Sequence, residues 1–487
     1  MEKNKYFGNQ YPLDDVSHHK DTLDKKNQLK VSSNGSIYGD DIWVFWKEIS
    51  QNNTKDSAKE IRWNFKFEDG SYFCDPCYSD FLESSKDFIY SLRFMESIRG
   101  GTLKSSTIVR LFRELKALIK WMVSLKIANY SFITTALIND YVVFVKSYKY
   151  RDKLLTKGPI QKRLDILEKL WMQRDHMTFG IGNPPFPNSS SYQISGLNKE
   201  YQRANKFDFI PDEVALDLVN KALDYVQNKS SRIVPAFLAG KKARKNAYKL
   251  GRSKSTAEKH ERKAIKDFNY EMVGQVTTDV CFLRTACYII IAFFSGIRDS
   301  ELASIHTNCI EIDDVDGYIW LNGVTYKLAD NSKADRFMVP PIVKEAVNVL
   351  KKIHGWYLEE LTKQIKENEK LLQESKIDGK KRQDLLNKIE HQYLIKNALF
   401  LVMSSKNCNE VNTNKTIHAQ LKEFVMHHNV VRHLGEIWNL HPHQFRKTFV
   451  RFMVKNSVNL RYLAEHFKYI SLEMIAWYDT DNVELIK

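Results

Sequence analysis

Apolar residues recur along most of this chain at steps of three and four, which is the spacing of one buried face on an α-helix. The first 80 residues are polar and irregular, and the spacing becomes regular from Ser105 onward. Further helices are expected from Thr134 or Thr135 and after Pro159. We therefore predict a helical bundle over residues 85–182. The clearest of its helices has the predicted buried positions Ile108, Leu111, Leu115, Leu118 and Met122, and its N-cap is expected among Ser105, Ser106 and Thr107.

A segment rich in proline, serine and asparagine follows the bundle, over residues 182–191. Such residues interrupt regular structure and commonly mark a boundary between domains. We place a linker at residues 183–209 and a second, larger domain at residues 210–487. Residues 1–84 are expected to form a small N-terminal module, with contact to DNA as one candidate role.

Strand patterns are concentrated in residues 309–339, where short alternating runs flank a turn at Asp316-Gly317. They predict a small antiparallel sheet in a chain that is otherwise mainly α-helical. A charged segment near 356–395 has two helical arms separated by Asp378-Gly379. It predicts a projecting helical hairpin with a structural role or a contact to a partner protomer.

The charge of the chain points to a polyanionic partner. Lys and Arg number 74 against 59 Asp and Glu, a formal net charge of +15, which favours DNA, RNA or an anionic membrane surface. Positive charge is dense over residues 241–263. This stretch is either a contact to the phosphate backbone or a solvated basic loop. The residues that would make the contact are Lys241, Lys242, Arg244 and Lys245.

Several classes of protein are disfavoured by the remaining patterns. The longest apolar run spans nine residues, 286–294, and predicts a buried helix, since a membrane span needs about 20 residues. The N-terminus lacks the apolar core of a secretory signal, so we expect a cytoplasmic protein. Cys74 and Cys77 have metal-like spacing, but no second Cys/His pair follows at finger distance. Ordinary thiols are favoured over zinc, and no metal is expected.

Three C-terminal segments contain residues suited to chemistry. In the first, over residues 294–302, Gly296 ends an apolar helix and Arg298 follows. In the second, over residues 441–448, Pro442 can begin a helix. His443 and Arg446 would then share one face of it. The third ends at Tyr478, after an expected helix-turn-helix. Each of these residues alone is common at protein surfaces or in protein cores.

Taken in order, the three segments resemble the tyrosine recombinase (phage integrase) family. That family has Gly-hydrophobic-Arg-x-Ser-Glu-Leu, then Pro-His-x-hydrophobic-Arg-x-Thr, then a tyrosine near the C-terminus. The resemblance covers roughly residues 85–487. It implies a helical core-binding (SAM-like) domain, a linker, and a mainly helical catalytic domain with one small sheet.

The resemblance also implies roles for individual residues. Tyr478 would attack the DNA phosphate and form a 3′-phosphotyrosine. Arg298, Arg446 and His443 would hold the phosphate, because its pentavalent transition state carries extra negative charge that preorganised cations stabilise. A lysine in the β-hairpin would protonate the leaving 5′ oxygen, with Lys327 favoured and Lys333, in the following turn, as the alternative. Glu301 would orient Arg298 or cap the local backbone, with proton transfer as the alternative.

One position departs from the family pattern. The family has a histidine nine residues before the nucleophile, where this chain has Tyr469. His466 lies nearby, one helical turn earlier. We expect the change at Tyr469 to tune the activity more than to abolish it.

The resemblance implies double-stranded DNA with specific recombination sites as partner, a tetramer in the synaptic complex, no cofactor and no membrane. The expected protein is a DNA-associated bacterial enzyme that acts as the integrase or transposase of a mobile element. Two alternatives stay open: relaxation of DNA by a type IB topoisomerase mechanism, and a non-catalytic accessory protein that binds DNA.

Overall fold

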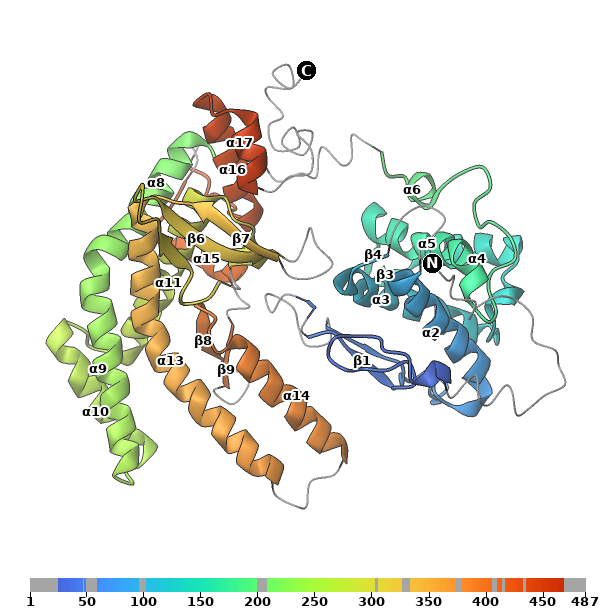
Figure 1. The fold of residues 1–487 in the computed structure, drawn as a ribbon, viewed down its shortest axis with the longest axis horizontal. Coiled ribbons are helices and arrows are strands. Elements are labelled where there is room, and N and C mark those ends of the chain that lie inside the picture. Colours follow the sequence, from blue (N-terminus) through green and yellow to red (C-terminus); the bar gives the residue numbers. More distant parts are fainter. Residues whose placement is uncertain are drawn as a thin grey trace. The chain divides into compact units, whose positions relative to one another are not determined.

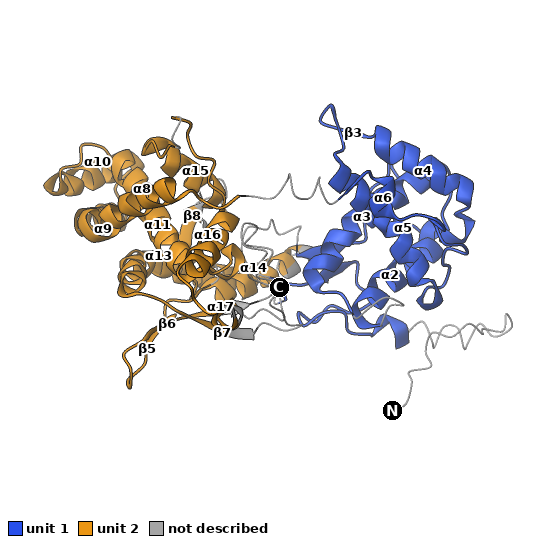
Figure 2. Cartoon of the chain, turned by 90° about the horizontal axis from the view of Figure 1, so that it is seen from above, with its two compact units in different colours: residues 1–49, 54–206 blue, residues 50–53, 207–487 orange. Residues whose placement is uncertain are grey.

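The computed structural model describes residues 25–46, 48–49, 59–95, 102–198, 208–302, 305–325, 333–373, 379–404, 410–413, 417–431 and 435–467. The chain forms two compact units, shown in Figure 2. The first comprises residues 1–49 and 54–206, and the second comprises residues 50–53 and 207–487. Each unit has its own hydrophobic core, and each is described by itself below.

The first unit is a helical bundle with a small β-element. The buried positions expected for its longest helix are all buried, so the prediction of an amphipathic helix there is confirmed. That helix is N-capped by Lys104, without a side-chain hydrogen bond, so the expected cap at 105–107 is wrong. Thr134, by contrast, caps the next helix by accepting from the N–H of Leu137. The helices of the unit are α2 (Ser79–Phe94), α3 (Ser105–Ser124), α4 (Thr135–Ser147), α5 (Lys157–Met172) and α6 (Ser191–Ile194).

The described residues before α2 pack into this same unit and share its core. Strands β1 (Ile42–Val44) and β2 (Glu60–Arg62) pair antiparallel. They place Trp43 edge-on against Trp63, which in turn lies against Phe112 of α3. The expected boundary at residue 84 falls inside α2. In the structure no boundary separates these described residues from the bundle, because the aromatic residues before α2 and the apolar faces of the helices share one core.

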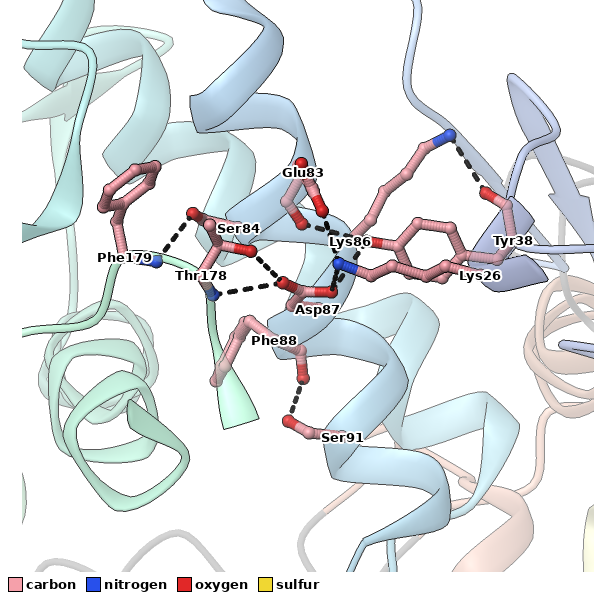
Figure 3. Close-up of polar contacts among 10 residues, drawn as sticks. All are labelled: Lys26, Tyr38, Glu83, Ser84, Lys86, Asp87, Phe88, Ser91, Thr178 and Phe179. Carbon is pink, nitrogen blue, oxygen red and sulfur yellow. Dashed lines mark hydrogen bonds and ion pairs between the residues drawn. The ribbon is translucent and has the colours of Figure 1, made fainter. Parts of the chain in front are cut away.

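Buried polar contacts reinforce this packing (Figure 3). Asp87 on α2 is 3% exposed, and its carboxylate accepts from the Tyr38 hydroxyl at 2.8 Å and from Thr178 Oγ1 at 2.7 Å. Lys26 approaches the same carboxylate to 2.7 Å. Lys86 donates to the carbonyl oxygens of three consecutive residues, 38–40. Helix α2 thus ties both ends of the unit together.

The second unit surrounds one long apolar helix. Helix α11 (Val273–Ser295) is long and apolar enough to cross a membrane by length and composition, but its most apolar window is 72% buried inside the unit. It is the central core helix, as expected for residues 286–294. The other helices of the unit are α8 (Asp212–Leu223), α9 (Ser230–Lys249), α10 (Lys254–Ile265), α12 (Asp299–Leu302), α13 (Pro341–Gln373), α14 (Gly379–Ile395), α15 (Ile417–His427), α16 (Pro442–Lys455) and α17 (Leu460–Phe467).

Two small antiparallel sheets complete the second unit (Figure 1). Strands β5 (Ile310–Ile312), β6 (Ile319–Thr325) and β7 (Lys333–Met338) form the sheet expected over residues 309–339. Strands β8 (Leu401–Ser404) and β9 (Glu410–Thr413) form a second pair, which the sequence did not predict. The predicted fold class, mainly α with a small antiparallel sheet, is confirmed.

Two segments of this unit differ from their predictions. The basic stretch 241–263, expected as a contact segment or a loop between helices, is folded into α9 and the following α10. The charged hairpin expected near 356–395 is made by α13 and α14, but α13 already begins at Pro341. Its first arm is therefore the extension of a core helix, because the buried positions run without a break from Val343 to Ile365.

Candidate active site

The site is built on the turn that ends α11. Gly296 is the C-cap of this helix and has a left-handed backbone, with φ +60°. A Cβ atom added there would lie 2.8 Å from the ring of Phe467 and 3.0 Å from that of Phe449. Both the conformation and the close approach therefore require glycine at this position.

Arg446 connects α16 to this turn. Its side chain is 3% exposed, and Nη1 donates to the carbonyl oxygen of Gly296 at 2.9 Å. The ring of Phe467 lies against the guanidinium, with its centroid 3.9 Å from Cζ. The arginine of the second sequence motif is therefore fixed to the backbone of the first motif, 150 residues earlier.

Arg298 lies two residues after Gly296 and is held by Glu301. The two side chains are 9% and 1% exposed, respectively. Nη1 of Arg298 donates to Oε1 of Glu301 at 2.7 Å, and the other carboxylate oxygen accepts from the Arg298 backbone N–H at 3.1 Å. One carboxylate thus orients the guanidinium and caps the short helix α12. This geometry favours the orienting role for Glu301 over proton transfer.

His443 lies in the first turn of α16, three residues before Arg446. The helix begins at Pro442, as the sequence predicted. His443 is exposed, whereas Arg446 is buried. The imidazole of His443 is therefore open to solvent. It lies at the N-terminal end of α16, as does Arg446, which donates to the carbonyl oxygen of Gly296.

His441, which the sequence did not single out, forms the N-cap behind His443. Its Nδ1 accepts from the His443 backbone N–H at 3.3 Å, and its own N–H donates to Gln444 Oε1 at 2.8 Å. The rings of His441 and His443 stack with centroids 5.4 Å apart. Burial, together with the nearby His418 and His443, lowers the pKa of His441 to about 4. The ring therefore stays neutral near pH 7, which suits its role as acceptor.

A second polar network lies beside Arg298, and the sequence did not predict it either. Asp299 accepts from the Tyr288 hydroxyl at 2.7 Å, and its other oxygen lies 3.6 Å from Nε2 of His418. The ring of His418 meets that of His441 edge-on at 4.8 Å. Burial and Asp299 raise the pKa of Tyr288, which keeps it a donor. His418 comes from α15, outside all three motifs, so only the fold brings it here.

His466, the nearest histidine to the substituted position, is part of the same turn. Its Nε2 lies 2.9 Å from the carbonyl oxygen of Ser295. The ring stacks on Phe449 with centroids 5.4 Å apart. The imidazole therefore contacts the last residue of α11.

An apolar groove of about 840 Å³ borders the site between β6, β7, α16 and α17. Phe449 and His466 are part of its wall, so the groove reaches the residues around Gly296. Phe452 and Tyr462 line it and are 58% and 69% exposed.

Other predicted site residues fall elsewhere. Tyr478, Tyr469 and Lys327 lie outside the described residues. Lys333 is the first residue of β7, paired with Thr325 of β6; its expected place in a turn is wrong, because the ladder continues to that residue.

The basic residues of α9 are largely bound within the unit. Lys241 and Arg244 contact Glu261 at 2.8 and 2.9 Å. Lys245 contacts Glu359 at 2.6 Å. Lys242 is exposed. In the part of the chain that the structure describes, no group of three or more His, Cys, Asp or Glu side chains is arranged for a metal ion.

A comparison with models of protein families finds a match over the region that contains the turn at Gly296. Residues 270–484 match the model of the phage integrase family. This part of the chain belongs to that family of tyrosine recombinases. The phage integrase domain includes the Arg298 and Arg446 segments and ends beyond Tyr478, whereas α9 lies outside it.

Solved structures and curated proteins were compared as well. The structures include the XerA recombinase, with 12% identity, coverage of 82% of this chain and 95% of that chain, and a TM-score of 0.28. XerH bound to its difH substrate has 10% identity, coverage of 84% and 94%, and a TM-score of 0.39. XerH on a palindromic difH substrate has 13% identity, coverage of 87% and 97%, and a TM-score of 0.38. No curated protein matches the chain.

Proposed function

We propose that this chain is a site-specific DNA recombinase that cleaves and rejoins duplex DNA through a 3′-phosphotyrosine at Tyr478. The observation that carries the proposal is the bond from Arg446 to the carbonyl oxygen of Gly296. It fixes the second arginine to the turn that presents Arg298. Two arginines from distant segments thus meet at one turn of a phage integrase domain.

Each residue then has a distinct role in phosphodiester exchange. Arg298 and Arg446 bind the non-bridging oxygens, where negative charge grows in the transition state. Guanidinium groups suit this because they stay charged and donate parallel hydrogen bonds. His443 donates a further hydrogen bond to the phosphate or accepts the proton of the nucleophile. Glu301 is a positioning residue for Arg298.

Tyr478 is the nucleophile in this proposal. A phenol has an ordinary pKa of about 10, so it needs cations nearby to react near neutral pH. Its oxygen forms a bond to phosphorus, and the bond from phosphorus to the 5′ oxygen breaks. The covalent intermediate conserves the energy of the phosphodiester, so rejoining needs no ATP. Lys327, with Lys333 as the alternative, protonates the leaving 5′ oxygen, and Tyr469 occupies the usual histidine position.

The proposed partner is duplex DNA with recombination sites, assembled with a tetramer of this chain. We place the reaction in the movement of a mobile element, as integrase or transposase. The net charge of +15 supports a polyanionic substrate.

Covalent capture from a mixture of DNA sequences tests the proposal and selects the recombination site in the same experiment. A pool of duplexes that contain a randomised segment and a nick is incubated with the protein, and the DNA retained on a denaturing gel is sequenced. The nick lets the short leaving strand diffuse away and traps the intermediate. The matched control is Tyr462→Phe, because Tyr462 is an exposed tyrosine on α17.

The proposal predicts an adduct in the wild type and in Tyr462→Phe, and none in Tyr478→Phe. Tight binding without an adduct would favour the accessory protein. Relaxation of supercoiled plasmid that lacks the selected site would favour the topoisomerase.

A further inference from the structure

The first unit has a short β-hairpin that the proposed chemistry does not use. Strands β3 (Lys149–Tyr150) and β4 (Lys153–Leu154) pair antiparallel between α4 and α5. All six residues from 149 to 154 are exposed. Figure 2 shows the hairpin, at the label β3, standing clear of the helices of its unit.

Positive charge is concentrated on this hairpin and at the end of the preceding helix. Lys146, Lys149, Arg151 and Lys153 are all exposed, and Asp152 is the single acid among residues 146–154. None of the four cations makes an ion pair with another described residue. Their charge is therefore available to a partner.

The cations of α9 provide a contrast within the same chain. Lys241 and Arg244 both contact the buried Glu261, and Lys245 contacts Glu359. Their role inside the second unit is thus accounted for. Lys242 and Lys249 of α9 stay exposed, so the contrast concerns only these three side chains. The hairpin differs from α9 in carrying its exposed cations on a two-stranded ribbon.

The register of the hairpin distributes its side chains over two faces. Lys149 pairs with Leu154, and Tyr150 pairs with Lys153. Residues directly opposite each other in an antiparallel pair lie on the same face, so each face has one cation and one apolar side chain. Tyr150 and Leu154 are 59% and 57% exposed. A ribbon with a cation on both faces matches a channel bounded by two rows of negative charge.

The tip of the hairpin adds a third cation in an unfavourable conformation. Arg151 and Asp152 have φ of +50° and +63°, as a type I′ turn requires. Asparagine and glycine are strongly preferred at such positions, because they tolerate the left-handed region. Arg151 lies at this turn with its guanidinium 5.4 Å from the centroid of the Tyr150 ring, and it puts a positive charge at the tip of the hairpin.

We propose that this hairpin is a DNA-contacting wing of the first unit. The two-stranded ribbon enters the major groove, Lys149 and Lys153 bind the phosphates on either side, and Arg151 is at the leading tip. The major groove of B-DNA is about 12 Å wide and admits a two-stranded β-ribbon. The inference rests on the proposed function only in taking DNA as the partner.

The chemistry of the hairpin favours DNA over an anionic membrane surface. Insertion into a lipid interface needs a continuous apolar face with cations beside it. Here the two apolar side chains lie on opposite faces. Two rows of phosphate are the better match.

The test measures the affinity of the protein for a short duplex of random sequence. Fluorescence anisotropy gives this affinity at salt concentrations between about 50 and 200 mM. The variant is Lys149→Gln/Arg151→Gln/Lys153→Gln. Its matched control is Lys25→Gln/Lys30→Gln/Lys66→Gln, which removes the same charge from exposed residues of the same unit. Each phosphate contact contributes about 0.9 to the slope of log affinity against log salt.

For three contacts, the slope should become shallower by about 2.7 in the hairpin variant. The salt-induced loss of affinity over that range then shrinks by roughly 40-fold relative to wild type. Arg151→Gly, which relieves the turn and leaves the strands intact, should lower the slope by about one contact. The control triple variant should keep the wild-type slope.

An unchanged slope in the hairpin variant, or an equal change in the control, would overturn the inference. Addition of vesicles rich in phosphatidylserine gives a second arm. Vesicle binding that depends on the hairpin, with an unchanged DNA slope, would favour the membrane. The covalent adduct at Tyr478 is a separate readout: if it forms while the slopes do not differ, only the wing is refuted.

Discussion

Arg446 and Gly296 are joined by a hydrogen bond of 2.9 Å from a buried guanidinium to a helix-ending carbonyl. This contact makes the turn after α11 the point where the two arginine motifs converge. The same glycine faces Phe467 of α17, the helix that precedes the segment with Tyr478. Changes at this turn should therefore affect stability and cleavage together.

We expect Gly296→Ala to destabilise the second unit. The left-handed backbone costs about 1–2 kcal/mol for a residue with a Cβ, and overpacking against Phe467 adds about 1–3 kcal/mol. The matched control is Gly317→Ala, because Gly317 has φ +71° but open space around its Cα. It should show the backbone cost alone. Urea unfolding of both variants measures the difference, and equal midpoints would contradict the close approach.

Glu301→Gln should slow cleavage and also lower the stability of the second unit, because it removes the charge partner of the buried Arg298. The amide can still accept from the Arg298 N–H but loses its charge, and a hydrogen bond to a charged group is worth about 1.5–3 kcal/mol. We expect the single-turnover rate to fall roughly ten- to hundredfold. Glu311→Gln is the control, since Glu311 is an exposed acid whose carboxylate contacts Asn322. A wild-type rate in Glu301→Gln would show that Arg298 needs no such orientation.

Acid should weaken the second unit partly through His441. Its pKa is lowered to about 4 in the folded chain, whereas an unfolded histidine has a pKa of about 6.5. The unfolded state therefore binds more protons between these values, and stability is lost as pH falls from about 6.5 toward 4. His441→Asn keeps an N-cap acceptor and removes the titrating ring. Its urea midpoint should fall less over this pH range than that of the wild type, and identical pH profiles would contradict the assignment.

The sequence predicted the elements whose signal is local. The three-and-four spacing from Ile108 to Met122 identified a core helix, and Pro442 marked the start of α16. The α9 segment was harder, because its Lys and Arg residues suggested solvent although they favour helices. Its partner Glu261 belongs to a different helix. Such pairings depend on tertiary contacts that no local pattern encodes.

The same reason explains why the sequence separated residues 1–84 from the bundle and why it missed some site residues. Asp87 meets Tyr38 and Thr178 only after the chain has folded back on itself. His418 likewise reaches Asp299 from α15. The family motifs identified Arg298, Glu301, His443 and Arg446, but not the residues that contact them.

Asp87→Ala should destabilise the whole first unit. The substitution removes the carboxylate that forms an ion pair with Lys26 and accepts a hydrogen bond from the Tyr38 hydroxyl. Lys26 keeps its ion pair with Glu83, so the expected cost is that of the lost hydrogen bonds to a charged group, about 1.5–3 kcal/mol each. Because residues before and after α2 share one core, we expect both to become sensitive to limited proteolysis together. Cleavage confined to residues before α2 would instead indicate a separate N-terminal module.

In the proposed reaction, Tyr478 becomes covalently joined to DNA at the turn where Arg446 binds the carbonyl oxygen of Gly296. Mass spectrometry of the protease-digested adduct from the nicked duplex pool identifies the modified residue directly. We expect a nucleotide on the peptide that contains Tyr478, and no such nucleotide in Arg446→Met. A nucleotide on Tyr469 or any other residue, or no adduct on any DNA in the pool, would contradict it.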